Sequence, residues 1–232
     1  MPEDAADATL PPTVRGRATR DRIVASAAEL VLTHGLDTLS VENVRRAASV
    51  SGSQMSHYFA DKEALLRAVI MRQTDALLEF HRQPALGGLD SFEDFDRWVE
   101  LTLKFSARRT RSQAMPTYGA LAGQLGKYDD SIRELLADGY RQWMAVLRRG
   151  LTRMKTTGLL VDEADLAALV HVLIAAHEGG SQLTGVYAKT WPDRDALTYA
   201  LAYLRQFDAR KPSQPTVRRT SGRASATRRT RV

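Results

Sequence analysis

Apolar residues recur at helical spacing in the first third of the chain, and each run stops at residues that favour helix ends. The first run carries Ile23, Ala27, Leu30 and Val31. It stops at His34-Gly35, where a glycine suits the left-handed position after a helix. A second helix begins at Ser40, a good N-cap, and ends near Ser49; its apolar positions are Val41, Val44 and Ala48. Two helices, the second of them short, are therefore predicted before residue 50.

The next helix has unusually complete start signals. Ser51 and Gln54 have the spacing of a capping box, and Val50 and Met55 stand where a hydrophobic staple would pack. We therefore predict that this helix starts at Ser51 and buries Met55 and Phe59 on one face. A fourth helix, capped by Asp61, is predicted through Leu65, Leu66, Val69 and Ile70.

Beyond residue 70 the sequence predicts only more helices. An apolar face follows a loop that contains Pro84, Gly87 and Gly88; its members are Phe92, Phe95, Trp98, Val99, Thr102 and Phe105. A long helix over 131–154 begins with a second apparent capping box, Ser131 with Glu134. The last two helices are predicted from about Asp162 to Tyr187 and from Asp193 to Phe207.

No strand pattern accompanies these helices, so the predicted fold class is all-α in two domains. Residues 15–62 are predicted as a first domain of three helices and residues 63–208 as a second, larger helical domain. Residues 1–14 and 209–232 are predicted as disordered tails, the second because it is rich in Pro, Ser, Thr and Arg and almost free of large apolar residues.

The charge of the chain lies in its C-terminal tail. The formal net charge is +6, but residues 209–232 carry eight basic residues and no acid, which leaves 25 basic and 27 acidic residues elsewhere. Such a tail can bind phosphate backbones without reading sequence, or it can simply be solvated. With no cysteine, no apolar run of membrane-spanning length and no signal-peptide pattern in residues 1–14, we expect a cytoplasmic, nucleoid-associated protein with no membrane partner.

The helix predicted from Ser51 carries the clearest chemistry. Two short helices joined by a tight turn, the second with small polar residues at its start, suit a helix-turn-helix whose second helix enters the major groove. Small side chains let the helix backbone approach the base edges, and Gln54 can pair bidentately with adenine. His57, Tyr58 and Lys62 follow at the end of this helix, where donors could contact phosphates.

Residues 19–65 together resemble the DNA-binding domain of the TetR family of bacterial transcriptional regulators. The shared landmarks are a helix that ends in His-Gly, a Thr-x-Ser entry to the second helix, Val-Ser before the third, and His-Tyr-Phe followed by Asp-Lys-Glu. Three residues depart from the pattern: Ser49 where glycine or asparagine is frequent, Ser53 where glycine is frequent, and Ser56 where tyrosine is frequent. These departures leave the fold expectation intact and the operator sequence open.

The resemblance implies that residues 15–62 are a helix-turn-helix DNA-binding domain and residues 63–208 a helical domain for ligand binding and dimerisation. It further implies a regulator, most simply a repressor, that binds a palindromic double-stranded operator as a homodimer. The candidate DNA-contacting residues are Ser40, Ser51, Gly52, Ser53, Gln54, Ser56, His57, Tyr58 and Lys62. Gln54 has a second role open to it in the capping box, and Tyr58 could instead pack under the first helix. Arg15 and Arg17 could form a minor-groove arm or only a linker.

In the family the last two long helices pair with those of a second subunit, and the variable body holds an effector pocket. Small residues on those helices allow close approach, within one chain or between two: Ala167, Ala168, Ala175, Ala176, Gly179, Gly180, Ala196, Ala200 and Ala202. The candidate effector-binding residues are Trp98, Met115, Tyr118, Trp143, Met144, His171, His177, Glu178 and Gln182. They suit a small, largely apolar effector, although core packing is the commoner use of such residues.

The implied mechanism is displacement of the fourth helix by the effector, which changes the separation of the two recognition helices and releases the DNA. His171 and Glu178 share a helix face but lack a third ligand, so no metal and no cofactor are predicted. The sequence shows no Ser/His/Asp grouping and no phosphate-binding glycine loop, so we predict no enzyme. The alternative is a nucleoid-type binder that uses its arginine-rich tail without sequence preference.

Overall fold

The computed structural model describes residues 14–112 and 117–210, except for the side chains of Leu32 and residues 109–112. Helices build the described chain, and no strand occurs in it; one isolated β-bridge joins Leu160 and Asp208. The predicted all-α fold class is confirmed. The predictions for the tails concern residues outside the described ranges, apart from Val14, Ala209 and Arg210.

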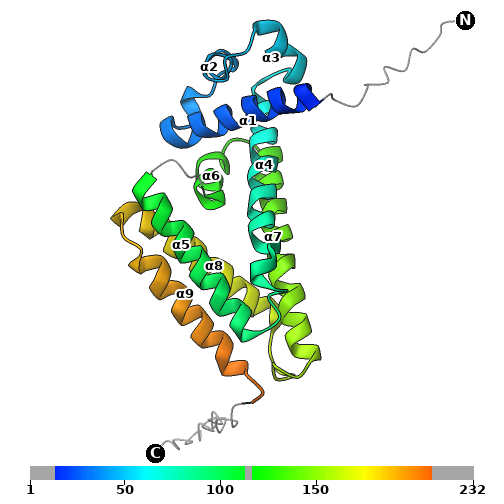
Figure 1. The fold of residues 1–232 in the computed structure, drawn as a ribbon, viewed down its shortest axis with the longest axis vertical. Helices are drawn as coiled ribbons and strands as arrows, with labels where there is room; N and C mark the ends of the chain where they lie inside the picture. Colours follow the sequence, from blue (N-terminus) through cyan, green and yellow to red (C-terminus); the bar gives the residue numbers. More distant parts are fainter. Residues whose placement is uncertain (1–13, 113–116, 211–232) are drawn as a thin grey trace, which may run out of the picture.

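Three helices form the N-terminal end of the molecule: α1 (Val14–His34), α2 (Val41–Ala47) and α3 (Gly52–Tyr58). α1 lies across this end, with α2 and α3 on the far side of it from the rest of the chain (Figure 1). A 3-10 turn, η1 (Leu36–Thr38), joins α1 to α2. Apolar residues of all three helices share one buried cluster that includes Ile23, Val44 and Met55.

The predicted end signals of these helices are present. Gly35 has a φ of 83°, the Ser40 side chain accepts a hydrogen bond from the Asn43 amide, and Asp61 accepts one from the Ala64 amide. Both hydrogen bonds of the Ser51–Gln54 capping box form. Because each signal acts within three or four residues, local sequence was sufficient to predict it.

The fourth helix, α4 (Lys62–Arg82), extends well beyond Ile70 and runs beside the long α7 (Asp130–Thr156) (Figure 1). Its first half packs in the same buried cluster as α1–α3, together with residues of α7. The predicted boundary after residue 62 therefore does not separate two hydrophobic cores.

The remaining helices are α5 (Phe92–Ser112), α6 (Tyr118–Leu125), α8 (Leu166–Tyr187) and α9 (Trp191–Leu204). α5, α8 and α9 lie side by side as a slanted layer, and α6 lies between this layer and α1 (Figure 1). A second buried cluster, which includes Phe95, Trp98 and Trp143, joins α5, α8 and α9 to α4 and α7, whereas α6 packs in the first cluster through Tyr118, Leu121 and Leu125. Two 3-10 turns complete the chain, η2 (Pro84–Leu86) and η3 (Arg205–Phe207).

Glycine permits the close pairing of α8 and α9. A Cβ at Gly180 would come within 2.7 Å of the Asp193 Cα and 3.1 Å of the Ala196 Cβ. Ala200 is also buried in this contact, whereas Ala175, Gly179 and Ala202 are exposed on the other side. Some small residues of the two helices thus pack within the chain, and the others lie on an outward face.

Three predicted helix starts are wrong, those of α7, α8 and α9. No start was predicted for α1, which begins at Val14, nine residues before Ile23, and whose polar first turns include Gly16. α7 is capped by Asp129, which accepts a hydrogen bond from the Ile132 amide; Ser131 lies inside the helix and binds Arg67 of α4 instead. This tertiary contact was invisible in the local pattern.

α8 is capped by Asp165 instead of Asp162, and α9 starts at Trp191 with Pro192 in its first turn, two residues before Asp193. Pro fits the first turn of a helix because its missing N–H would be unpaired there. The short helix α6, which contains Gly119 and Gly123, was not predicted. Glycine lowers helix propensity, so packing, and not the local sequence, stabilises α6.

Candidate nucleic-acid interface and effector pocket

α3 presents its polar side chains to solvent while two apolar residues anchor it. Met55 and Phe59 are almost fully buried, and Ser51, Gly52, Ser53, Gln54, Ser56 and His57 are exposed. The Ser51 amide donates to Gln54 Oε1 at 3.0 Å, and the Gln54 amide donates to Ser51 Oγ at 3.1 Å. The side-chain oxygen of Gln54 thus belongs to the capping box. The side-chain nitrogen of Gln54 remains available to donate a hydrogen bond to a base.

The turn before α3 requires an unusual backbone conformation at Ser49. Its φ is 52°, a left-handed value that favours glycine or asparagine. The amides of Ser49 and Val50 donate to the carbonyls of Arg46 and Arg45, both at 3.1 Å, and the Arg22 Nε of α1 donates to the Ala48 carbonyl at 3.0 Å. These bonds fix α3 relative to α1 and α2.

The residues at the end of α3 have partners within the protein. The rings of His57 and Tyr58 meet edge to face with centroids 4.9 Å apart, and Tyr58 is half-buried against the core cluster. The Lys62 Nζ lies 3.5 Å from the Leu36 carbonyl oxygen and 5.9 Å from the centre of the Tyr128 ring. Lys62 therefore connects η1, α4 and the segment before α7, and a phosphate contact by its ammonium stays a prediction.

Ser40, Arg15 and Arg17 lie in different surroundings. The half-buried Ser40 uses its hydroxyl as the cap of α2. Arg15 and Arg17 are exposed in the first turn of α1, so in the structure they belong to a helix and to neither predicted alternative, a minor-groove arm or a linker. The Thr19 hydroxyl, one turn on, donates to the Arg15 carbonyl at 3.0 Å.

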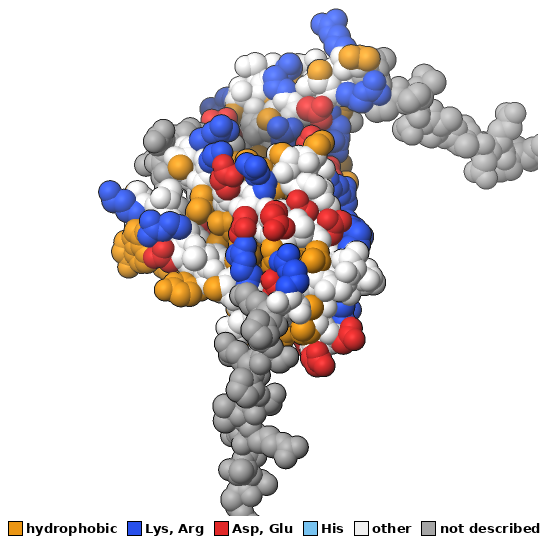
Figure 2. All heavy atoms as spheres, turned by 60° about the horizontal axis from the view of Figure 1, so that its bottom comes forward, with side chains coloured by type: hydrophobic (Ala, Val, Ile, Leu, Met, Phe, Trp, Pro, Cys, Tyr) orange, Lys and Arg blue, Asp and Glu red, His pale blue; other side chains and the backbone are white. Residues whose placement is uncertain are grey.

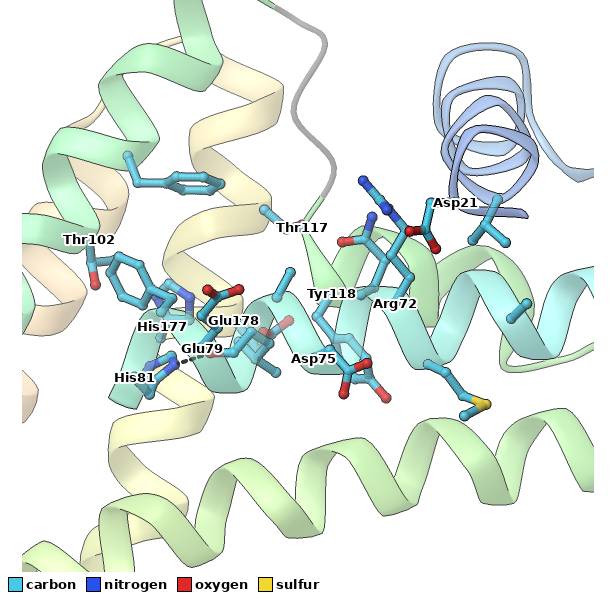
Figure 3. A pocket seen from close by; sticks show the side chains of 18 of the residues that line it. Asp21, Arg72, Asp75, Glu79, His81, Thr102, Thr117, Tyr118, His177 and Glu178 are labelled. Atoms are coloured by element: carbon cyan, nitrogen blue, oxygen red, sulfur yellow. Dashed lines mark hydrogen bonds between the residues drawn. The ribbon is translucent and has the colours of Figure 1, made fainter. Parts of the chain in front are cut away.

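A pocket of about 610 Å³ lies between α1, α4, α5, α6 and α8. Figure 3 shows His81, Thr102, His177 and Glu178 at one end of this pocket and Asp21, from α1, at the other. Tyr118, Arg72 and Asp75 lie between them. The same cavity therefore touches the helix that supports α3 and the helices of the body.

The structure brings together only part of the predicted effector-binding set. Tyr118, His177 and Glu178 line the pocket. Trp98 and Trp143 are fully buried behind its inner end, Met144 packs beside the second core cluster, and His171 and Gln182 are exposed on α8. For Trp98, Trp143, Met144, His171 and Gln182 the pocket-lining prediction is wrong, because core packing or the outer helix face takes these residues. Met115 lies outside the described residues.

Several lining residues were not predicted. They come from α1, which was assigned to DNA binding, from α4, which was assigned to transmission of the effector signal, and from α5. They include Arg20, Asp21, Arg72, Phe80, His81, Thr102 and Phe105. Two of them carried a sequence signal, since Thr102 and His81 are polar residues on otherwise apolar helix faces. Such residues are either satisfied in the core or directed to a ligand.

His81 is satisfied in the core. Its Nδ1 lies 2.7 Å from the Leu77 carbonyl oxygen, and its Nε2 accepts hydrogen bonds from the indoles of Trp98 at 3.0 Å and Trp143 at 2.8 Å. An acceptor at Nε2 requires the proton on Nδ1, so the ring is neutral. Burial lowers the pKa of His81 to about 4, against the weaker raising effect of the Leu77 carbonyl.

Glu178 is held against α6 and α7. A Cβ at Gly119 would overlap its carboxylate. Burial, and then the charge and hydrogen bonding of Glu178, raise the pKa of the Tyr140 hydroxyl. Burial also raises the pKa of Tyr118, whose hydroxyl donates to the Leu136 carbonyl at 2.8 Å. Both phenols are therefore neutral, and Tyr118 has already used its proton.

Within the described ranges, no three His, Cys, Asp or Glu side chains lie together in a way that could hold a metal ion. None of the helices in the same ranges is long and apolar enough to cross a membrane.

The capped, exposed α3, which packs with α1 and α2 and is followed by a helical body that contains a pocket, defines a helix-turn-helix fold. Residues 23–69 match the family described as bacterial regulatory proteins, tetR family. These residues belong to the TetR family of DNA-binding domains, which confirms the predicted resemblance.

A curated relative, the HTH-type transcriptional regulator UidR of Escherichia coli strain K12, is 30% identical over 69 residues. The match covers 30% of this chain and 35% of UidR, so it spans about a third of that relative's length.

Solved structures extend the likeness in fold to most of the chain. A TetR transcriptional regulator from Chloroflexus aurantiacus has a TM-score of 0.70 at 20% identity, over 84% of this chain and 98% of that one. Salmonella enterica GusR has a TM-score of 0.61 at 20% identity, over 81% and 96%. A TetR-family regulator from Cytophaga hutchinsonii has a TM-score of 0.71 at 13% identity, over 87% and 100%.

Proposed function

We propose that the protein is a TetR-like transcriptional repressor that binds a palindromic DNA operator as a homodimer and is released by a small, largely apolar effector. The observation that carries this proposal is the combination of an exposed, polar α3 with a pocket that contacts both α1 and α4. A ligand in that pocket would touch the helix that supports α3 directly.

DNA reading is assigned to α3. The small side chains of Gly52, Ser53 and Ser56 allow the helix to approach base edges, and the Gln54 amide nitrogen is a donor for the major groove. His57, Tyr58 and Lys62 are proposed to contact phosphates and set the register.

Dimerisation is assigned to the outward faces of α8 and α9. Exposed large hydrophobic residues gather there: Val172, Leu183, Val186, Tyr187, Trp191, Tyr199 and Tyr203. Figure 2 shows hydrophobic side chains that remain on the surface, gathered most clearly at one edge of the molecule. An apolar face of this extent is typical of a protein interface, and two subunits would present two copies of α3 to a palindrome.

Ligand control requires that the effector bind the DNA-free arrangement more tightly than the DNA-bound one. Because the pocket is lined by Arg20, Asp21 and Val24 of α1 and by residues of α4, a ligand that separates these helices would move α3 with α1. This supports the proposed displacement of α4, with α1 as a second element that moves.

The test is selection of bound duplexes from a random pool by the full chain and by a chain that ends at Asp208. We expect a palindromic motif with both. Gln54→Glu keeps a capping box, since glutamate serves at that position, but it removes the amide donor. This variant should lose operator affinity about tenfold or more at unchanged thermal stability. The control, Gln124→Glu, changes an exposed residue of α6 in the same way.

The proposal fails if no motif is enriched over random DNA. A different result would support the nonspecific nucleoid-type binder: the full chain retains DNA without sequence preference at every salt concentration, and the chain without residues 209–232 no longer retains it.

A further inference from the structure

Three buried polar atoms without a hydrogen-bond partner gather at the inner end of the pocket. Among the described residues, the buried side-chain atoms in this condition are Thr102 Oγ1 of α5, His177 Nδ1 of α8 and Asp193 Oδ1 of α9. Thr102 is 3% exposed and Asp193 is 0% exposed. An unpartnered buried polar group is costly and therefore uncommon, so three in one place need an explanation.

Asp193 connects the three atoms. Its Oδ2 accepts a hydrogen bond of 2.5 Å from Ser106, which lies one helical turn after Thr102 on α5. Its Oδ1 is 3.6 Å from His177 Nδ1, a separation too long for a good hydrogen bond. Thr102 and His177 line the pocket, with Asp193 behind them.

The polar groups of this end are mainly acceptors. The carboxylate of Asp193 faces Nδ1 of His177, which favours the proton on that nitrogen and leaves Nε2, on the opposite edge of the ring, as an acceptor. Both nitrogens of His81 and the hydroxyl proton of Tyr118 are already used within the protein. A ligand at this end therefore meets one nitrogen that needs a donor, His177 Nε2, and one hydroxyl, that of Thr102, that can donate or accept.

The rest of the pocket is suited to an apolar body. Leu77, Phe80 and Phe105 extend from the inner end, and Val24, Ala68 and Met71 line the side toward α1. A carboxylate head group at the inner end would lie close to the carboxylates of Glu178 (Figure 3) and Asp193. The protons of His81 and Tyr118 are already used, so the Thr102 hydroxyl would be the donor to such a head group. The chemistry thus discriminates between head groups of similar size.

We propose that the pocket binds an amphipathic molecule whose head group, an alcohol or amine, donates a hydrogen bond to His177 Nε2 and shares a second one with Thr102 Oγ1, while its apolar part lies along Phe80 and Phe105. This inference rests on the ligand pocket of the proposed function and adds the class of ligand. Asp193 acts as a positioning residue, since it orients His177 without touching the ligand.

The experiment is direct titration of the full chain, in the absence of DNA, with three probes that share one apolar body: phenylbutanol, its methyl ether and phenylbutyrate. Calorimetry gives the affinities, and quenching of Trp98 and Trp143, whose rings lie 6.1 Å and 5.3 Å from the His177 ring, reports the inner end. We expect the alcohol to bind about tenfold more tightly than the ether, because only the alcohol supplies a donor, and phenylbutyrate to bind more weakly than the alcohol.

Thr102→Val separates a recognition role from a structural one. Valine fills the same space without the unpartnered hydroxyl, so the ligand-free protein should melt at the same or a higher temperature. The alcohol-to-ether preference should nevertheless fall several-fold. The matched control is Thr74→Val in α4, a buried threonine outside the pocket lining whose hydroxyl has a partner, Tyr118. It should lower the melting temperature and leave the preference unchanged.

The proposal is overturned if the ether or phenylbutyrate binds as tightly as the alcohol, if Thr102→Val keeps the full preference, or if none of the probes binds at millimolar concentration. Since no DNA is present, each of these results leaves operator selection by α3 untouched. If the chain selects no operator but still prefers phenylbutanol to its ether, the DNA-binding function is contradicted and the ligand assignment of the pocket is retained.

Discussion

The Nε2 atom of His81 accepts a hydrogen bond of 2.8 Å from the indole N–H of Trp143, 62 residues along the chain. A second indole, that of Trp98, shares the same acceptor at 3.0 Å. Two buried donors directed at one nitrogen leave no room for a proton there. The ionised form of His81 is therefore incompatible with this core.

The first prediction concerns pH. The pKa of His81 falls from 6.5 to about 4 on folding, so the unfolded chain binds the proton more tightly. Stability is fully present above pH 6.5 and should decline as the pH falls from 6.5 toward 4, in total by about 3 kcal/mol. Urea denaturation at several pH values measures this decline.

The comparison variant is His81→Gln, which lacks the titrating ring. Its absolute stability will be lower, so the slope of unfolding free energy against pH is compared. Measurements above about pH 5 avoid the protonation of carboxylates such as Glu42 and Asp129, whose pKa values are lowered by hydrogen bonds from Arg45 and Ser131. Equal slopes in the two proteins would contradict the assignment.

The second prediction concerns the turn before α3. Ser49 has a left-handed φ of 52°, so Ser49→Gly should raise the free energy of unfolding by about 0.5 to 1 kcal/mol. Ser53→Gly, a change of the same type inside α3, should lower it by a similar amount. Thermal or urea unfolding of both variants measures the difference. Two changes of the same sign would count against the backbone explanation.

The third prediction concerns the contact between α7 and the loop after η2. A Cβ at Gly150 would overlap the Leu89 carbonyl and lie 3.0 Å from the Gly88 carbonyl oxygen, and backbone atoms cannot turn away as a side chain can. Gly150→Ala should therefore cost about 2 to 3 kcal/mol of stability.

The matched substitution is Gly123→Ala in α6, where the nearest atom to the new Cβ is Gln182 Nε2 at 3.9 Å. It should stabilise the protein by up to about 1 kcal/mol, because alanine is the better helix former. Equal effects of the two substitutions in a denaturation series would disprove the close approach at Gly150.

The fourth prediction concerns the outward face of α8 and α9. Val186 and Tyr199 are 78% and 76% exposed in the single chain, and Leu183 lies on the same α8 face as Val186. If this face is the proposed dimer interface, Leu183→Glu should weaken self-association about a hundredfold. The reason is that a two-fold symmetric interface buries one new charge from each subunit. Sedimentation over a concentration series measures it. Val14→Glu, at an exposed position of α1, is the control and should associate like the unchanged chain.

The sequence by itself determined the N-terminal three-helix end. Ser40, Ser51 and Asp61 each cap a helix through a hydrogen bond to a backbone amide three residues away, so the information is local. The alternation of buried and exposed positions in α3 is equally local, since it follows from the helical period. The start of α7 was mispredicted because Asp129, Asp130 and Ser131 are all plausible caps in sequence, and a contact of Ser131 with α4 decided between them.

Only the tertiary structure decided which residues meet in the pocket. Trp98 and Trp143 looked like ligand contacts, but both donate to His81 and belong to the core. The pocket instead takes residues from five helices, and the meeting of Thr102 and His177 depends on how α5 packs against α8. Helical periodicity states which face of a helix is buried; it does not state which other helix covers that face, because that depends on contacts between residues far apart in the chain.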